Sequence, residues 1–219
     1  MGLFSLLFRT KKQQSRAELR PPTDNVETGL SGQTDQKSTA ILQSIHQVRE
    51  KNFRAASSIV SSYEAKQINK RGLGVDWSNP DTDTDVGLLT TMFAARPAIL
   101  NGIAEHEWDA LRVAAAMMHL WGTNRCTEWL PDGFVGTSRF NHDTACRMIL
   151  FYAQTIQNIS EWREMGINKV TVLSCGKDSC PACKSHSDIK FSLDDTPELP
   201  CPLCTHPMGC RCEFLPVLD

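Results

Sequence analysis

The sequence lacks any long apolar run, and its net charge is small. No stretch approaches the roughly eighteen apolar residues of a transmembrane helix, so we expect no membrane span. A formal net charge of −2 gives no general attraction to a polyanion, which weighs against nucleic-acid binding without excluding a local basic patch. With 41% apolar and 22% charged residues, the 219-residue chain is expected to be globular, with one sizeable core or two small ones.

Common catalytic motifs are missing as well. There is no Gly-rich phosphate loop, no Gly-x-Ser-x-Gly element and no paired-carboxylate site. His106-Glu107 begins like the His-Glu-x-x-His motif of zinc proteases, but Ala110 stands where the second histidine is required. Asp83 and Asp85 belong to an alternating acidic run, yet its glycine and its final glutamate are misplaced for a calcium loop. We therefore expect no enzymatic activity, and a toxin-like or transferase-like enzyme is the less favoured alternative.

Two cysteines stand apart from the rest. Cys126 and Cys146 are expected to be small buried hydrophobic residues. His142 lies four residues before Cys146 and could share its helix face, which makes a Cys/His nucleophile the catalytic alternative.

The other seven of the nine cysteines lie at or after position 175. Two Cys-Pro-x-Cys elements, at residues 180–183 and 201–204, are separated by seventeen residues, which matches the spacing of a structural zinc site. A Cys-x-x-Cys turn brings two thiolates to one side, and two such turns supply the four soft ligands of a tetrahedral Zn²⁺. The proline in each turn lowers the entropy lost when the turn forms.

The ligand set has several candidates. Spacing alone favours four cysteines, and three further residues close to the second turn compete for the same ion; together they are Cys180, Cys183, Cys201, Cys204, His206, Cys210 and Cys212. One zinc ion with four of these ligands is the leading hypothesis. A second ion, using Cys175 or His186, is the alternative. The excess of thiolates favours a closed, structural site over a catalytic one.

Disulfide and redox roles are less favoured than metal binding. The apolar run at residues 3–8 is too short for a secretory signal, and no helical pattern follows Cys183 as a redox Cys-x-x-Cys would require. We therefore expect a reducing, cytoplasmic location.

A Cys-x-x-Cys pair, a linker ending in proline and then His-Pro-x-x-Cys-Arg-Cys make up the end of the chain, preceded by a predicted helix and strand over residues 144–174. This arrangement resembles the Mu F-like phage head morphogenesis (minor head) proteins over about seventy C-terminal residues. The matching residues are Cys180, Cys183, Pro200, His206, Pro207, Cys210, Arg211 and Cys212. This chain has one extra residue between His-Pro and Cys-Arg-Cys, and it has the additional Cys201 and Cys204.

The resemblance implies a non-enzymatic protein of virion assembly. Its partners would be capsid, portal or scaffold components, with no small-molecule substrate, and its location would be the prohead or virion. It also implies that His206, Cys210 and Cys212 supply the second ligand pair. The alternative is a zinc ribbon that binds nucleic acid or a protein. Within the cluster, however, acidic residues outnumber the basic Lys184, Lys190 and Arg211.

The whole sequence predicts a mainly α fold: a helical body with a small C-terminal β-rich zinc-binding module. We expect a disordered tail at residues 1–36, a helical domain at 37–166 and a Cys/His zinc-binding module at 167–219. Apolar spacing predicts helices at 38–71, 86–95, 97–121 and 144–165 and a strand at 169–173, with which 213–218 can pair.

Residue types predict the boundaries and loops. Ser38 is expected to cap the first helix, which is long enough that we expect a break near Asn52 or a single packing rod. Gly122 is expected to end the third helix. Residues 72–85 and 124–140 are predicted loops; the second is pinned to the core by Trp129, Phe134 and Phe140.

Overall fold

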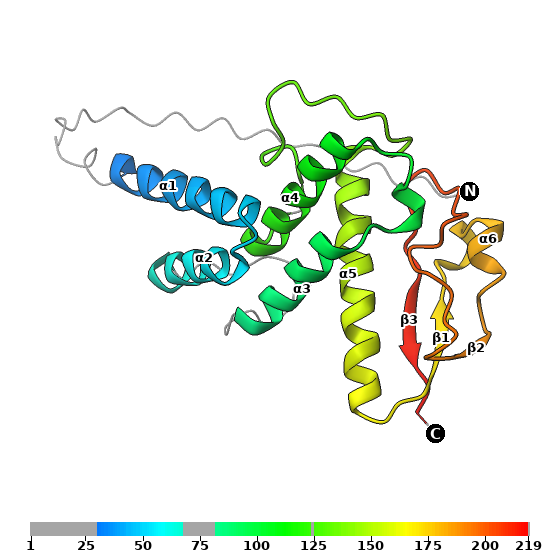
Figure 1. Ribbon diagram of the computed structural model, residues 1–219. Coiled ribbons are helices and arrows are strands. Elements are labelled where there is room, and N and C mark those ends of the chain that lie inside the picture. The colour runs from blue at the N-terminus through cyan, green and yellow to red at the C-terminus, as the bar shows by residue number, and fades with distance from the viewer. Residues whose placement is uncertain (1–29, 68–81, 124, 219) are drawn as a thin grey trace, which may run out of the picture.

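The structure, a computed structural model, describes residues 30–67, 82–123 and 125–218. In this part of the chain the protein is mainly α, as predicted. Helices α1 to α4 gather on one side of the long helix α5, and a small sheet with the cysteine-rich segments lies on the other side (Figure 1). The predicted tail up to residue 29, the predicted end of the first helix at residue 71 and most of the loop at 72–85 lie outside the described residues. The predicted disorder is wrong for residues 30–36, which are helical.

The predicted first helix is two helices. α1 (Leu30–Arg49) and α2 (Phe53–Gln67) pack side by side as a helical hairpin, so the expected break near Asn52 is confirmed. Lys51 takes the left-handed conformation at φ 58°, which reverses the chain within three residues. α1 begins before Ser38, which is therefore not its cap. The helix extends back because Gln36 and Lys37 are good helix formers.

Helix α3 (Thr82–Ala94) carries the acidic first turn that the sequence predicts, with Asp83 and Asp85. The predicted loop at 72–85 is wrong for its last four residues, which are helical. Asp85 is only 2% exposed; it accepts a 2.6 Å hydrogen bond from Ser57 Oγ and lies 2.8 Å from His119 Nε2. This carboxylate therefore ties α2, α3 and α4 together.

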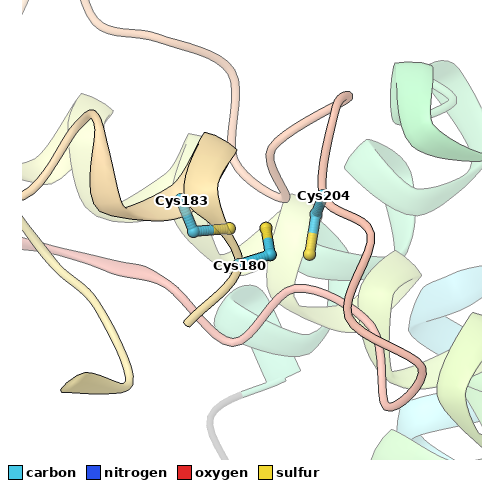
Figure 2. A group of neighbouring side chains, drawn as sticks. All are labelled: Cys180, Cys183 and Cys204. Atoms are coloured by element: carbon cyan, nitrogen blue, oxygen red, sulfur yellow. The ribbon is translucent and has the colours of Figure 1, made fainter. Parts of the chain in front are cut away.

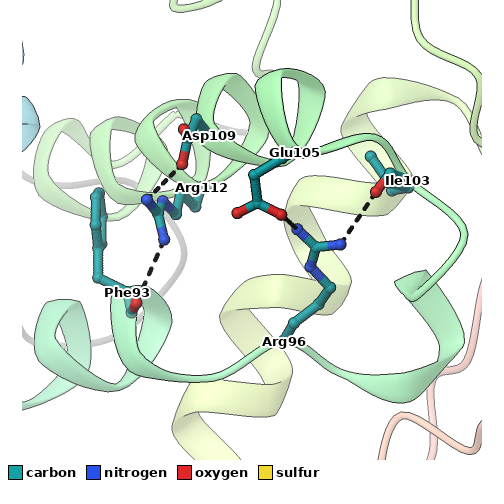
Figure 3. A network of polar contacts seen from close by, with 6 residues as sticks. All are labelled: Phe93, Arg96, Ile103, Glu105, Asp109 and Arg112. Atoms are coloured by element: carbon teal, nitrogen blue, oxygen red, sulfur yellow. Dashed lines mark hydrogen bonds and ion pairs between the residues drawn. The ribbon is translucent and has the colours of Figure 1, made fainter.

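The predicted helix at 97–121 is interrupted. A short 3₁₀ turn, η1 (Ala98–Leu100), is followed by α4 (Glu105–Trp121), which ends at Gly122 with φ 62° as expected. Arg96 holds the interruption: its guanidinium donates to the Ile103 carbonyl at 3.0 Å and pairs with Glu105 Oε2 at 2.6 Å (Figure 3). These tertiary contacts override the helical spacing of the apolar residues.

Helix α5 (His142–Glu164) starts two residues earlier than predicted because Asn141 caps it by accepting a hydrogen bond from the Thr144 amide. Cys126 and Cys146 are both 0% exposed, which confirms them as buried residues. The Cys146 thiol donates to the Leu111 carbonyl, and a hydrogen bond with Cys126 together with burial raises its pKa. Cys146 therefore lies in the helical core, as expected of a small buried hydrophobic residue.

The segment between α4 and α5 is irregular, as predicted. Trp129 and Phe140 are buried in the helical core, and Phe134 packs against it. The carboxylate of Glu107, 2% exposed, accepts hydrogen bonds from the amide and hydroxyl of Thr137 at 3.0–3.1 Å. This loop is therefore fixed by apolar and polar contacts at once.

The C-terminal sheet has three antiparallel strands in the order β2-β1-β3. β1 (Lys169–Leu173) has the predicted bounds and buries Val170 and Val172. β3 (Glu213–Pro216) pairs with it, so the predicted return of the tail is confirmed. β2 (Lys190–Ser192) was not predicted, because three residues carry too little alternation to signal a strand.

Buried side chains form two clusters, one among the helices and one around β1, β3 and the cysteines. Ile159 and Trp162 of α5 pack against the second cluster. Since α5 contacts both clusters, the division into two domains at residue 166 stays a prediction. Among the described residues, no helix is both long and apolar enough to cross a bilayer.

Candidate metal centre

Three segments bring six cysteines together. The first is the turn that starts α6 (Pro181–Lys184), with one cysteine just before the helix and one on it. The second is the turn at residues 201–204, closed by a 3.0 Å hydrogen bond from the Cys204 amide to the Cys201 carbonyl. The third leads into β3. All six side chains are 1–8% exposed: Cys180, Cys183, Cys201, Cys204, Cys210 and Cys212.

The thiols form two trios that share Cys183. In the first trio, the sulfur atoms of Cys180, Cys183 and Cys204 lie within 4.8 Å of one another, and their side chains come together from α6 and the turn at 201–204 (Figure 2). In the second trio, the sulfur atoms of Cys183, Cys210 and Cys212 meet the same limit. Cys183, on α6, is therefore the centre of the cluster.

The sulfur spacing fits a tetrahedral metal ion. Two ligands bound to one zinc at about 2.3 Å are separated by roughly 3.8 Å in tetrahedral geometry. The Sγ atoms of Cys183 and Cys210 lie 3.8 Å apart. Thiolates are soft ligands that bind zinc and iron–sulfur groups strongly. The chemistry and spacing of these donors therefore fit a thiophilic metal ion.

Cys201 lies beside both trios without belonging to either. Its amide donates a hydrogen bond to Cys210 Sγ at 3.3 Å, and its own thiol interacts with that of Cys183. Burial raises the pKa of the Cys201 thiol, although the Leu203 amide donates to its sulfur.

Hydrogen bonds prepare two of the sulfurs for the anionic form. Burial raises the pKa of Cys180, but the amides of Thr205 and Cys183 donate to it and more than offset burial, so the pKa falls to about 6. The Cys212 thiol donates to Cys210 and lowers the pKa of Cys210 to about 5 against the effect of burial. These two sulfurs are the first expected to lose their protons.

The neighbouring thiols respond in the opposite direction. Burial raises the pKa of Cys183, and it raises the pKa of Cys204 to about 11. Donation of its proton to Cys210, together with burial, raises the pKa of Cys212. A cation is therefore required before all six sulfurs can be thiolates, and its binding releases protons.

The other predicted candidates lie outside the trios, and among the described residues both groups of closely spaced metal-ligand atoms consist of cysteines alone. His206 is half-buried; its Nδ1 accepts from the Met208 amide at 3.1 Å, and its Nε2 lies 3.5 Å from the Arg211 guanidinium. Cys175 donates its thiol proton to the Arg211 carbonyl. The His186 ring packs near Phe191 at 6.2 Å between centroids.

Two residues that the sequence analysis missed fix the centre to the helices. Arg139 donates to the Cys204 carbonyl at 2.8 Å while its guanidinium lies over the Phe140 ring. Gly209, at φ 75°, touches α5 so closely that a Cβ there would lie 2.7 Å from Thr144 Cγ2. The glycine at position 209, two places after His-Pro, could have indicated from the sequence that the backbone approaches another element closely there. No sequence signal pointed to Arg139.

Little free space lies beside the cysteines. The cavity that Cys175, Cys180, Cys204 and His206 line has a volume of about 10 Å³, the size of a single water. No family model, curated protein or solved structure matches this chain. We therefore infer function from the cysteine cluster and its surroundings.

Proposed function

We propose that the protein is a non-enzymatic structural protein whose C-terminal end folds around zinc and which acts in assembly with other proteins. The burial of six thiols from three segments at one point carries this proposal. Bound zinc supplies folding free energy, on the order of 10–16 kcal/mol for structural sites. A whole domain has a net stability of only about 5–15 kcal/mol. The module thus depends on its metal.

Three properties favour a structural ion over a catalytic one. The donors are all sulfur, they are buried, and the adjoining cavity of about 10 Å³ has no room for a substrate. A catalytic zinc normally has three protein ligands and an open position for water or substrate. Here thiols exceed the four ligands that a single ion needs, which favours a closed site.

The choice of zinc over an iron–sulfur cluster rests on spacing. The two Cys-Pro-x-Cys turns have the separation of a zinc ribbon, and the 3.8 Å between Cys183 and Cys210 suits two ligands of one small ion. Elemental analysis of the purified full-length chain tests this assignment. Zinc is expected, and iron with acid-labile sulfide would contradict it.

The assembly function rests on the resemblance to phage minor head proteins and on the shape of the module. Leu203, in the second cysteine turn, is 76% exposed, and Met208 is 49% exposed. Exposed apolar side chains held on a rigid, metal-fixed turn are suited to contact another protein. We propose capsid, portal or scaffold components as partners, in a prohead or virion.

Co-sedimentation of the full chain with the portal and scaffold proteins of its own genome tests this function. Leu203→Asp is expected to weaken co-sedimentation at least tenfold without loss of zinc. Leu42→Asp, on α1, is the matched control because Leu42 is also exposed, at 67%. The assembly function is wrong if the wild-type chain does not co-sediment. The assignment of the binding surface to Leu203 is wrong if both variants co-sediment equally well. A gene position beside portal and terminase genes would support it independently.

A further inference from the structure

The cluster holds more thiols than a single zinc ion binds. The two trios contain five different cysteines, and Cys201 beside them makes six. A tetrahedral ion takes four ligands. A single ion would leave two thiols buried against a thiolate cluster without a bond to metal.

Resting on the proposed zinc-dependent fold, we propose that the centre holds two zinc ions joined by shared thiolates. Two tetrahedral ions need eight ligand positions, and six cysteines fill them if two of the sulfurs bind both ions. Cys183 is one shared ligand because it belongs to both trios. The two trios then define the two ions, one on the side of Cys180 and Cys204 and the other on the side of Cys210 and Cys212.

Cys201 is the second shared ligand. Each trio is one ligand short of four, and Cys201 is the one remaining buried cysteine of the cluster. Its thiol interacts with that of Cys183, and its amide reaches Cys210 Sγ at 3.3 Å. Cys201 therefore lies beside the second trio, next to Cys183 and Cys210.

Charge is compatible with two ions. Six thiolates carry a charge of −6, which two Zn²⁺ ions reduce to −2, the same net charge that one Zn²⁺ bound by four thiolates would have. Cys201 is 2% exposed, and its amide donates to Cys210 Sγ at 3.3 Å.

Metal stoichiometry of the full-length chain separates this inference from the proposed function. Native mass spectrometry and elemental analysis are expected to give two zinc ions for each chain. One zinc ion would overturn the two-ion centre and leave the structural zinc site in place. No zinc, with the cysteines oxidised in pairs, would overturn both.

Cadmium substitution tests the shared sulfurs directly. With ¹¹³Cd in the wild-type chain, two resonances are expected, each split by coupling to the other through a common thiolate. Two unsplit resonances would contradict the bridges. Cys201→Ser is expected to lower the zinc content from two ions to one or none, because it removes a ligand from both. The matched control, Cys175→Ser, changes a cysteine outside the trios and is expected to retain two.

Discussion

The helical body and the C-terminal module stay folded for different reasons. The helical core buries leucine, methionine, valine and alanine side chains contributed by α1 to α5 and the loop before α5. The module core consists of the six cysteines and only five other buried apolar residues, namely Val170, Val172, Leu193, Leu199 and Phe214. Apolar burial alone can stabilise the body, whereas so small a core needs cross-links. The comparison predicts that the two regions fail independently.

Metal removal is expected to have the largest effect, and only on the module. Chelation of zinc from the full chain should remove on the order of 10 kcal/mol from the module, while α1 to α5 stay folded. Cys183→Ser should destabilise the module in the same way, because Cys183 belongs to both trios. Hydrogen exchange measured by mass spectrometry is expected to show rapid exchange at residues 174–212, which include α6, and unchanged protection in α1 to α5.

Cys175→Ser is the control for this experiment, since Cys175 lies in the same module outside the trios. It is expected to keep its metal and its protection. Slow exchange at 174–212 after complete chelation would show that the module is stable without metal. It would contradict the view that the body and the module stay folded for different reasons.

A cavity in the helical core is expected to have the converse effect. Leu120 is 0% exposed, and Leu120→Ala should lower the free energy of unfolding of the body by about 2–5 kcal/mol. Its zinc content should equal that of the wild type. Denaturant unfolding followed by circular dichroism measures the loss. A fall in bound zinc in the same variant would show that the two regions unfold together.

The contact at Gly209 sharpens the comparison, because it joins the two regions. Gly209→Ala places a Cβ 2.7 Å from Thr144 Cγ2 and 2.9 Å from Met148 Sδ, at a residue with φ 75°. Strain and overpacking are expected to cost about 1–3 kcal/mol. Faster exchange is expected at both the module and the first turns of α5. Gly133→Ala is the matched control: φ is 70° there, but no atom lies within 4 Å of the added Cβ.

Arg139→Ala should have a smaller effect. It removes the hydrogen bond to the Cys204 carbonyl and the packing over Phe140, which are together worth about 1 kcal/mol at an exposed side chain. The expected result is slightly faster zinc transfer to a competing chelator, with unchanged stoichiometry. Arg125→Ala, in the same loop, is the control. Equal zinc transfer rates in the two variants would show that Arg139 does not help to fix the metal centre to the helices.

Thr137→Val should have the smallest effect, and only in the body. The amide and the hydroxyl of Thr137 lower the pKa of Glu107, against the effect of burial. A carboxyl group with a lowered pKa stabilises the fold above its ordinary pKa of 4.5, and this contribution is lost as the pH falls below it. The melting temperature of the variant should therefore be lower than that of the wild type at pH 7, and the two melting temperatures should converge toward pH 3. A constant difference would show that the ionised carboxylate is not involved.

The sequence predicted what local pattern decides. The strand at 169–173 and the stop at Gly122 followed from alternating valines and from the left-handed preference of glycine. The break between η1 and α4 was missed because it depends on Arg96 reaching Ile103 and Glu105. β2 was missed because it exists only through its pairing with β1.

The sequence named the candidate metal-binding residues, but it did not predict how they group in space. Spacing identified four of the cysteines, and Cys210 and Cys212 were candidates because they lie close to the second turn. Neither argument gave a reason to place Cys183 in both trios or to separate His206 from them. That arrangement depends on how α6, the turn at 201–204 and the approach to β3 meet in space. Residues that are distant in sequence meet there, and spacing along the chain does not encode it.

Helix α5 has a mechanical consequence for any larger particle that includes this protein. Its first half is buried among the other helices, and Ile159 and Trp162, near its end, lie against the module. A helix of 23 residues is about 35 Å long and resists bending. A protein that binds the cysteine-rich end of the module would therefore have the α1–α2 hairpin at a fixed angle and distance from its own binding surface. Reorienting one end would require the other end to turn with it.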